Sequence, residues 1–263
     1  MKKKFKAIVL RTAGTNCDAE TVHAAQHAGF TVDLVHINEL FSKKKKLSAY
    51  VFLIIPGGFS YGDDIASGRV FANQLRFRLA RDMLSFVNDG KLVLGICNGF
   101  QVLVKTGILP GFDYRHFRQD VSLIDNDSER FEDRWVYLKK ISRNCVFTRD
   151  MPERIFLPVA HAEGKFVTPD SSMEQTLWKE NMVVLTYTDS HGVSKGYPWN
   201  PNGSQGNIAG ICNNTGRILG LMPHPERFVL PCQHPFWTRC SSNLAADGIH
   251  IFRNAFECVR AGL

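Results

Sequence analysis

The stretch Leu92–Gln101, with the sequence LVLGICNGFQ, decides the fold of this chain and carries the residue on which its predicted chemistry depends. Its first half is apolar, as in a strand that is buried on both faces of a parallel sheet. Cys97 follows, with Gly95 and Gly99 two residues away on either side. Where a strand turns abruptly into a helix, the side chain at the turn is lifted clear of the sheet, and flanking glycines let neighbouring backbone come close. We therefore expect an exposed thiol at a helix start, where the helix dipole favours the thiolate.

A second strand-to-turn stretch, Leu219–Arg227 with the sequence LGLMPHPER, supplies the groups that a nucleophilic thiol needs. His224 lies between two prolines that restrict the backbone, and it can act as the base. Glu226 is two residues further on, and residues two apart in extended chain point the same way, so its carboxylate can orient the imidazole. Cys97, His224 and Glu226 are thus the predicted nucleophile, base and orienting acid. The competing interpretation is a cysteine that merely fills the core.

Length and composition are those of an ordinary globular protein. The chain has 263 residues, of which 44% are hydrophobic and 22% are charged, which suffices for one large core. No apolar stretch reaches the ~20 residues that a membrane span requires, and the basic N-terminus leads into a strand pattern instead of a secretory signal. Seven cysteines are scattered without Cys-x-x-Cys pairs, so a disulfide framework is not expected. These features predict a cytoplasmic protein without a membrane segment.

The net charge of +7 raises the question of a nucleic-acid ligand. The densest basic block, Lys43–Lys46, stands between a helical pattern and a strand pattern and has no interleaved aromatic residues. That context favours a solvated loop, so we expect no nucleic-acid binding. Electrostatic attraction for phosphorylated substrates or for an acidic partner surface stays open.

Strand and helix patterns alternate in the first hundred residues. Strands are expected at residues 6–11, 31–37, 50–55 and 92–96, a helix that Thr15 or Asn16 caps is expected to run to about Ala28, and another helix is expected at about 73–88. Such alternation predicts a doubly wound α/β sheet, in which ligands bind at the carboxyl ends of the strands. Both Cys97 and the glycine pair at 57–58 fall at such ends.

The second half of the chain has a different pattern, which predicts a mixed sheet. Strands are expected at residues 135–140, 154–159, 182–188, 207–212 and 218–222, and a final helix at about 244–260. No internal repeat or linker is visible. We therefore expect a single domain over residues 1–263, with a C-terminal extension from about residue 230.

Several motifs together resemble a known family. They are GTNCD (14–18), PGGFSYGD (56–63), GICNGFQ (95–101), NDS (126–128) with RWV (134–136), NPNGS (200–204) and PHPER (223–227). The cysteine and His-Pro-Glu motifs by themselves resemble class I glutamine amidotransferases. The GGFSYGD and NPNGS motifs narrow the resemblance to the glutaminase subunits of phosphoribosylformylglycinamidine synthase, which acts in purine biosynthesis. This resemblance implies a flavodoxin-like α/β fold, with a mostly parallel central sheet flanked by helices and a smaller antiparallel or mixed sheet.

The resemblance also implies an activity and a partner. Members hydrolyse glutamine to glutamate and ammonia and deliver the ammonia to a separate synthetase subunit. That subunit uses ATP and Mg to convert formylglycinamide ribonucleotide to its amidine, and in some relatives a small third subunit bridges the two. This chain has no Gly-x-x-x-x-Gly-Lys-Ser/Thr phosphate loop, so we expect no cofactor in it and assign ATP to the partner.

Site residues follow from the same resemblance. The backbone N–H groups of Gly58 and Asn98 would form the oxyanion hole, and the substrate-binding residues would be Gly57, Phe59, Gln101 and His161. The stretch around His161 reads AHAEG (160–164), with Ala162 where the family has glycine. Because of that difference, the backbone of this loop need not have the shape that it has in the family. The alternative to substrate binding is that His161 and Glu163 anchor the loop. The NPNGS turn is an interface candidate, since in the family it faces the synthetase.

Other residues that could bind metal or substrate have weaker support. Cys17 can lie at the rim of the same site, although a structural cysteine is the simpler interpretation. His23 and His27 are four residues apart on one helical face, but no third ligand is in view, so a surface pair is expected and no metal site.

Three alternatives stay open at this point. The first is a class I amidotransferase that serves another synthetase, such as that of GMP, CTP or anthranilate. The second is a cysteine peptidase or stress protein of the same fold, which should lack the His-Pro-Glu motif. The third is a binding module without catalysis, in which replacing Cys97 leaves function intact.

Overall fold

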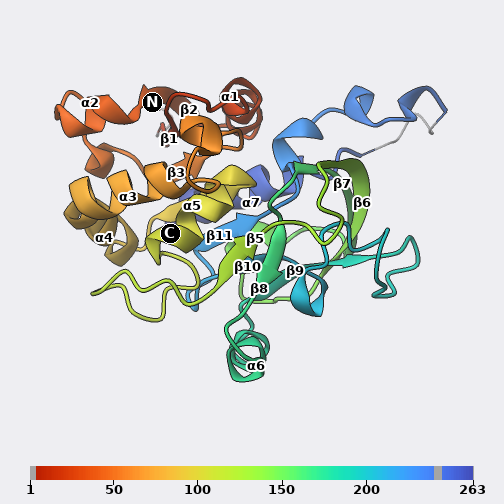
Figure 1. Ribbon diagram of the computed structural model, residues 1–263. Helices are drawn as coiled ribbons and strands as arrows, with labels where there is room; N and C mark the ends of the chain where they lie inside the picture. The colour runs from red at the N-terminus through yellow and green to blue at the C-terminus, as the bar shows by residue number, and fades with distance from the viewer. Residues whose placement is uncertain (1–3, 240–244, 263) are drawn as a thin grey trace.

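The computed structural model describes residues 4–239 and 245–262, in which nine strands form one sheet (Figure 1). The strand order is β2-β1-β3-β4-β11-β10-β9-β6-β7. The strands are β1 (Lys6–Arg11), β2 (Thr31–His36), β3 (Phe52–Ile55), β4 (Leu92–Ile96), β6 (Glu132–Lys140), β7 (Arg154–His161), β9 (Val183–Thr188), β10 (Ile208–Cys212) and β11 (Ile218–Leu221). Every predicted strand is confirmed to within three residues at either end, because the apolar runs that indicated them are the buried core of the sheet.

The sheet has a parallel half and an antiparallel half. β2, β1, β3, β4 and β11 run parallel, whereas β10, β9, β6 and β7 continue the same sheet with antiparallel pairing. A separate two-stranded antiparallel sheet consists of β5 (Ser122–Ile124) and β8 (Lys165–Val167). The class I amidotransferase type of α/β fold is thus present, with most of the antiparallel strands joined to the main sheet and only β5 and β8 apart from it.

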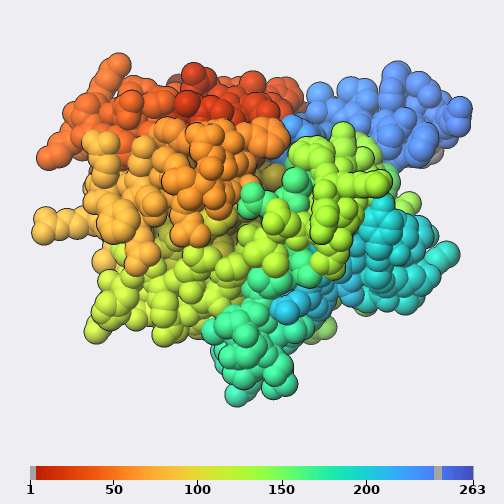
Figure 2. Space-filling view, viewed as in Figure 1, coloured from red at the N-terminus to blue at the C-terminus, as the bar shows by residue number. Residues whose placement is uncertain are grey.

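Seven helices lie in the described residues, and those other than α6 surround the parallel half of the sheet. The seven are α1 (Asp18–His27), α2 (Ile37–Phe41), α3 (Arg69–Arg78), α4 (Ala80–Asn88), α5 (Asn98–Thr106), α6 (Ser171–Lys179) and α7 (Ile249–Arg260). Helix α5 packs against β3, β4 and β11, and α3 packs on α5. Helix α7 contacts α1, and its Phe256 ring packs on Phe5 and Phe30. In Figures 1 and 2, α6 projects from the lower edge of the molecule, far from the helices of the parallel half.

Three expectations about local structure were wrong. The helix predicted at about 73–88 is two helices, since the chain leaves helical geometry at Leu79, which has φ −122° and ψ 14°. Neither Thr15 nor Asn16 caps α1. Cys17 is the residue before the helix, the Thr15 hydroxyl accepts from Thr12 N and the Asn16 carbonyl faces the Cys17 thiol. The final helix, expected from about residue 244, begins at Ile249. Helix α6 and the strands β5 and β8 were not predicted, and the two strands span only three residues each, too few for a periodic pattern.

Glycine on both sides of Cys97 has the role that the sequence predicts. A Cβ atom on Gly99 would lie 1.8 Å from the Ile55 carbonyl oxygen, and one on Gly95 would lie 2.6 Å from the Gly99 oxygen. Real Cβ atoms do not approach other atoms so closely, so the start of α5 can press against β3 and β4 only where side chains are absent. Gly107, with φ 79°, then ends the helix in the left-handed conformation.

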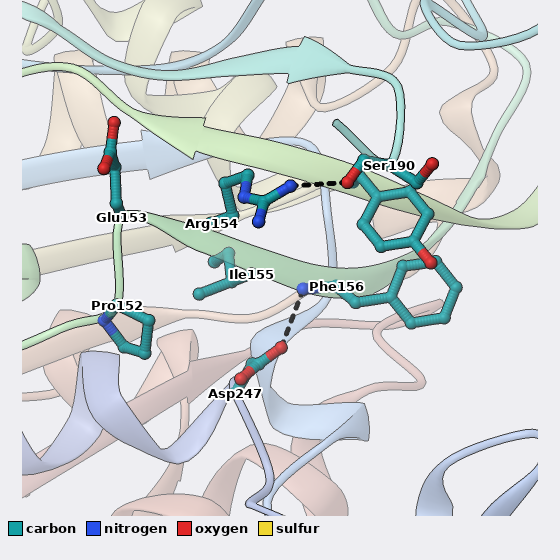
Figure 3. A pocket seen from close by; sticks show the side chains of 8 residues that line it. Pro152, Glu153, Arg154, Ile155, Phe156, Ser190 and Asp247 are labelled. Carbon is teal, nitrogen blue, oxygen red and sulfur yellow. Dashed lines mark hydrogen bonds between the residues drawn. The ribbon is translucent and has the colours of Figure 1, made fainter. Parts of the chain in front are cut away.

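The segment that follows β11 crosses the outer edge of the sheet. There the Asp247 carboxylate accepts a hydrogen bond of 2.8 Å from Phe156 N of the edge strand β7 (Figure 3). This contact lies in a pocket of about 470 Å³, whose other wall includes Arg154 bonded to the carbonyl of Ser190 (Figure 3). None of the predicted site residues lines this pocket. Residue 244, the expected start of the final helix, lies outside the described residues.

No helix in the described part of the chain is long and apolar enough to cross a membrane. The block Lys43–Lys46 lies in the loop between α2 and β3, as predicted, and within it Lys44 and Lys45 form ion pairs with Glu39 and Asp33.

Replacing Gly99 by Ala is expected to destabilise the fold strongly, because the added methyl group meets the backbone of β3. Overpacking of this kind costs about 1–3 kcal/mol or more, which urea unfolding measures. Gly196→Ala is the matched control, since a Cβ there meets nothing within 4 Å. Equal stability of the two variants would contradict the argument.

Candidate active site

Two neighbouring parallel strands bring the predicted nucleophile and base together. Strand β11 pairs with β4 so that Leu221 lies beside Ile96, and the Cys97 N–H donates to the Leu221 oxygen at 2.8 Å. Cys97 and His224 therefore leave the sheet at the same carboxyl edge, although they are far apart in the sequence. Figure 1 shows β11 and α5 near the centre of the molecule, where the two elements are in contact.

Cys97 occupies the turn between β4 and α5 with φ 50° and ψ −106°. This combination of backbone dihedral angles is uncommon for residues other than glycine and costs about 1–3 kcal/mol. The expectation of an exposed thiol was wrong, since Cys97 is only 6% exposed and its Sγ lies 3.7 Å from the Ala160 oxygen. The end of β7 covers the thiol, and the pocket that remains beside it has a volume of about 200 Å³. The pocket is lined by Gly58, Phe59, Asp63, Ser67, Cys97, Gln101, Ala160, His161, Ala162 and Glu163.

His224 and Glu226 form a fully buried pair. The Glu226 Oε1 atom lies 2.6 Å from His224 Nδ1, as the two-residue spacing predicts, although a short 3-10 helix (Pro225–Arg227) and not extended chain provides the geometry. The His224 N–H donates to the Pro158 oxygen of β7 at 2.8 Å. The remaining polar atoms, His224 Nε2 and Glu226 Oε2, have no hydrogen-bond partner within the described residues.

Charges around His224 favour its protonated form. Burial lowers the pKa of this imidazole, but the Glu226 carboxylate and the Cys97 sulfur oppose burial and raise the pKa well above its ordinary value. An imidazole with a raised pKa holds its proton near neutral pH and can give it to a leaving group.

The predicted oxyanion donors have no acceptor of their own. Gly58 has φ 135°, and neither its N–H nor the Asn98 N–H hydrogen-bonds to any part of the chain that the structure describes. Asn98 is the first residue of α5, where backbone N–H groups lack intrahelical acceptors. Gly58 lines the pocket beside Cys97. Two free donors near a nucleophile fit the binding of a developing negative charge.

The side chain of Asn98 connects the nucleophile turn to the loop after β3. Its oxygen accepts from the Ser60 hydroxyl at 2.6 Å, and its nitrogen donates to Asp63 at 3.1 Å and to Gln101 at 3.0 Å. The Gly58 loop is therefore held in register with Cys97 by buried hydrogen bonds. The sequence analysis gave Asn98 only a backbone role, because nothing in the local sequence identifies the partners of its side chain.

The four predicted substrate-binding residues divide into two groups. Phe59, Gln101 and His161 line the pocket, and Gln101 is buried rather than solvated, with its nitrogen bonded to the Glu163 carbonyl. Gly57, the fourth residue predicted to bind substrate, is not among the residues that line the pocket. A Cβ on Gly57 would lie 2.8 Å from His224 Cε1 and 3.2 Å from Cys17 Sγ, so this glycine makes room for the imidazole.

The loop after β7 is tied to Asn126. The Asn126 side chain bonds to the carbonyl of His161 and to the N–H of Gly164, and its backbone N–H donates to the Ala162 oxygen at 2.8 Å. Ala162 has no positive φ and is exposed, so alanine fits where the family has glycine. The Glu163 carboxylate accepts from Ser67 N at 3.3 Å.

The NPNGS turn is held by its own polar side chains, and Asn200, Pro201 and Gly203 also line a pocket of about 360 Å³. Asn200, Asn202 and Ser204 are buried. Asn202 donates to the Gly164 carbonyl at 2.8 Å, and the Ser204 hydroxyl accepts from Phe166 N at 2.9 Å. These side chains hold the loop that ends the pocket, because a buried polar side chain must find partners within the chain.

Cys17 lies beside the His224–Glu226 pair, and not at the rim of the site. Its Sγ atom is within 4.8 Å of ligand atoms of His224 and Glu226, the one group of this kind among the described residues. Arg227 donates to the sulfur at 3.2 Å, so this thiol already has a cationic partner from the chain itself. Desolvation raises the pKa of the Cys17 thiol. His23 and His27 stack on the exposed face of α1 and belong to no such group.

His161 makes the fold sensitive to acid. Burial, aided by the charge of His224, lowers its pKa to about 3. The unfolded chain, with a pKa near ~6.5, takes up this proton first, so the contribution to stability is present above ~6.5 and is lost as the pH falls towards 3.

Between pH 6 and 4.5 the unfolding free energy of the parent protein should therefore fall about 1.4 kcal/mol per pH unit more steeply than that of His161→Gln. Urea titrations of both proteins at several pH values measure the two slopes. Parallel slopes would show that His161 titrates normally in the fold.

Comparisons with known proteins agree with this geometry. Residues 4–259 match the family model of the CobB/CobQ-like glutamine amidotransferase domain. A phosphoribosylformylglycinamidine synthase subunit PurQ of Dehalococcoides mccartyi is 47% identical over 98% of both chains, and one of Pyrococcus furiosus is 36% identical over 98% of this chain and 99% of its own.

Solved structures of similar proteins also agree with this fold. The structure of PurLQS from Thermotoga maritima contains a chain that is 31% identical, with a TM-score of 0.74 and coverage of 98% and 100%. A glutamine amidotransferase from the same organism, 17% identical with a TM-score of 0.56 and coverage of 97% and 98%, shares the fold. The chain therefore belongs to the glutamine amidotransferase family of PurQ subunits of phosphoribosylformylglycinamidine synthase.

Proposed function

We propose that this protein hydrolyses glutamine to glutamate and ammonia and delivers the ammonia to the synthetase subunit of phosphoribosylformylglycinamidine synthase. The observation that carries the proposal is the placement of Cys97 and His224 at one edge of adjacent strands, with Glu226 Oε1 2.6 Å from the imidazole. The Gly58 and Asn98 N–H groups at the same edge have no acceptor within the described chain. These are the parts that amide cleavage by a thiol requires.

The reaction runs in two halves. The Cys97 sulfur forms a bond to the side-chain carbonyl carbon of glutamine, and the carbonyl oxygen takes up negative charge between the Gly58 and Asn98 N–H groups. His224 gives its proton to the amide nitrogen as the C–N bond breaks, so ammonia leaves and a thioester remains. Water then attacks the thioester carbon while His224 takes a proton from it. The C–S bond breaks, glutamate leaves, and the Cys97 thiolate is restored beside the protonated His224.

Buried surroundings support both halves. Glu226 holds the imidazole by its Nδ1 atom, which leaves Nε2 free for the proton transfers. The covered pocket of about 200 Å³ limits the water around the thioester, and electrostatic interactions are stronger in such a site than in bulk water.

The proposal includes the partners. The relatives named above are subunits of phosphoribosylformylglycinamidine synthase, and the PurLQS assembly of Thermotoga maritima contains a chain similar to this one. We assign ATP and Mg to the synthetase subunit and no cofactor to this chain. A small third subunit that bridges the two is a further partner under this proposal.

We also propose one glutamine amidotransferase domain over residues 1–263, with an extension from about residue 230, and a cytoplasmic location. Support for the domain comes from the continuous sheet and from the family match over residues 4–259. The six cysteines within the described residues carry free thiols, as is usual in a reducing compartment.

Cys97→Ala should lower glutamine-dependent amidine synthesis by the complex more than ~1000-fold, because no thioester can form. Synthesis from added ammonium salts should persist, since it needs only the synthetase. A glutamine-analogue electrophile, applied with and without the synthetase, should modify Cys97, and mass spectrometry locates the modified residue. Modification at another residue, or full glutamine-dependent activity in the variant, would refute the assignment.

Gly57→Ala tests the space that His224 needs. The new methyl group, 2.8 Å from His224 Cε1, should displace the imidazole and lower kcat about 100-fold with little change in KM. Glutaminase kinetics of the complex and circular dichroism of the chain measure these effects. Unchanged kcat in a folded variant would mean that the ring position is not critical.

A further inference from the structure

The hydrogen bonds of Asn126 fix the protonation of the His161 ring. The Asn126 nitrogen donates to the carbonyls of Arg130 at 2.9 Å and His161 at 2.8 Å. Its oxygen accepts from Gly164 N at 3.0 Å and lies 3.2 Å from His161 Nδ1. With the amide orientation set by two carbonyls and one N–H, the atom facing Nδ1 is an acceptor, so Nδ1 carries the proton.

The other ring nitrogen of His161 is therefore a bare acceptor. His161 is 3% exposed, and burial lowers its pKa to about 3, so the ring stays neutral near pH 7. Nε2 then has a lone pair and no proton, and it has no hydrogen-bond partner within the described residues. A buried polar atom without a partner costs about 1–3 kcal/mol, and a ligand that supplies an N–H group relieves that cost.

The ring lies beside the nucleophile. His161 lines the same pocket as Cys97 and Gly58, and the residue before it, Ala160, contacts the Cys97 sulfur. The Nδ1–Cε1 edge of the ring faces Gly164, where an added Cβ would lie 2.4 Å from both atoms. Nε2 is the nitrogen that does not face this loop, and His224 is close enough to affect the titration of the ring.

Glutamine and glutamate differ in the group that would meet such an acceptor. The carboxamide of glutamine has two N–H donors, whereas the side-chain carboxylate of glutamate has only lone pairs and a negative charge. A fixed lone pair attracts the first and repels the second. A site that is built to bond a particular group rejects analogues that lack it, because its own polar atom is then left unpaired.

We propose that His161 distinguishes glutamine from glutamate, with Nε2 accepting a hydrogen bond from the side-chain carboxamide and Asn126 holding the ring in the required tautomer. This role rests on the proposed glutaminase function and deepens it. His161 is thereby a specificity residue that favours substrate and expels the acidic product, which differs from the anchoring role considered above.

The test compares binding of the two amino acids in the intact complex with the synthetase. Calorimetry on the Cys97→Ala protein gives the Kd of glutamine and of glutamate without turnover, and the ratio of the two is the readout. His161→Leu removes the acceptor, and His161→Gln replaces the fixed acceptor by an amide that can present either end. Both are expected to lower the preference for glutamine at least 10-fold, by weaker glutamine binding, tighter glutamate binding or both.

A purely structural role gives a different result. Disturbance of the loop would weaken both amino acids alike and leave the ratio unchanged, which would overturn the proposal, as would a parent complex that binds both equally. If His161→Leu does not fold, His161→Gln decides alone. Glutamine binding by the parent complex with no turnover in protein that retains Cys97 would instead refute the proposed function.

Discussion

The site depends on the close approach of α5 to the strands beneath it. Because Gly95 and Gly99 have no side chains, the helix start rests directly on the backbone of β3 and β4, and Cys97 is forced into a positive-φ turn at the strand end. The same contact places the free N–H of Asn98 beside the nucleophile. The parallel pairing of β4 with β11 then sets the position of His224 relative to the thiol. A looser packing would separate groups that must act within a few ångströms of one another.

Buried polar side chains hold the rest of the pocket around this contact. Asp63 accepts hydrogen bonds from Ser67, Gly68 and Asn98, and the buried Lys105 amine donates to the Ser67 carbonyl. The loop after β7 joins the same network through Glu163. Most walls of the pocket are therefore loops fixed by hydrogen bonds, which is how a rigid site is built at the edge of a sheet.

Sequence patterns were informative where a feature is local. The glycine spacing around Cys97 and the two-residue spacing of His224 and Glu226 report contacts between near neighbours, and both predictions agree with the structure. The roles of Cys17 and of the Asn98 side chain depend on residues far away in the chain, and no local pattern encodes them. The burial of the polar side chains in the NPNGS turn was not predicted either, because the partners of Asn202 and Ser204 come from residues 164–166. The burial of Cys97 was missed because the residue that covers it, Ala160 at the end of β7, is far away in the sequence.

Electrostatics explains why the triad tolerates complete burial. Glu226 is 0% exposed and one of its oxygens has no hydrogen-bond partner in the described chain, so most of its charge must be balanced by the imidazole. That requirement raises the pKa of His224 against the effect of burial. The proton needed for departing ammonia is thus held in place by the same carboxylate that orients the ring. His161, which lines the pocket, is kept neutral by burial and by the nearby His224 charge. Two neighbouring histidines therefore have opposite protonation because only one of them has a carboxylate partner. This difference gives His224 the role of acid and leaves His161 as an acceptor.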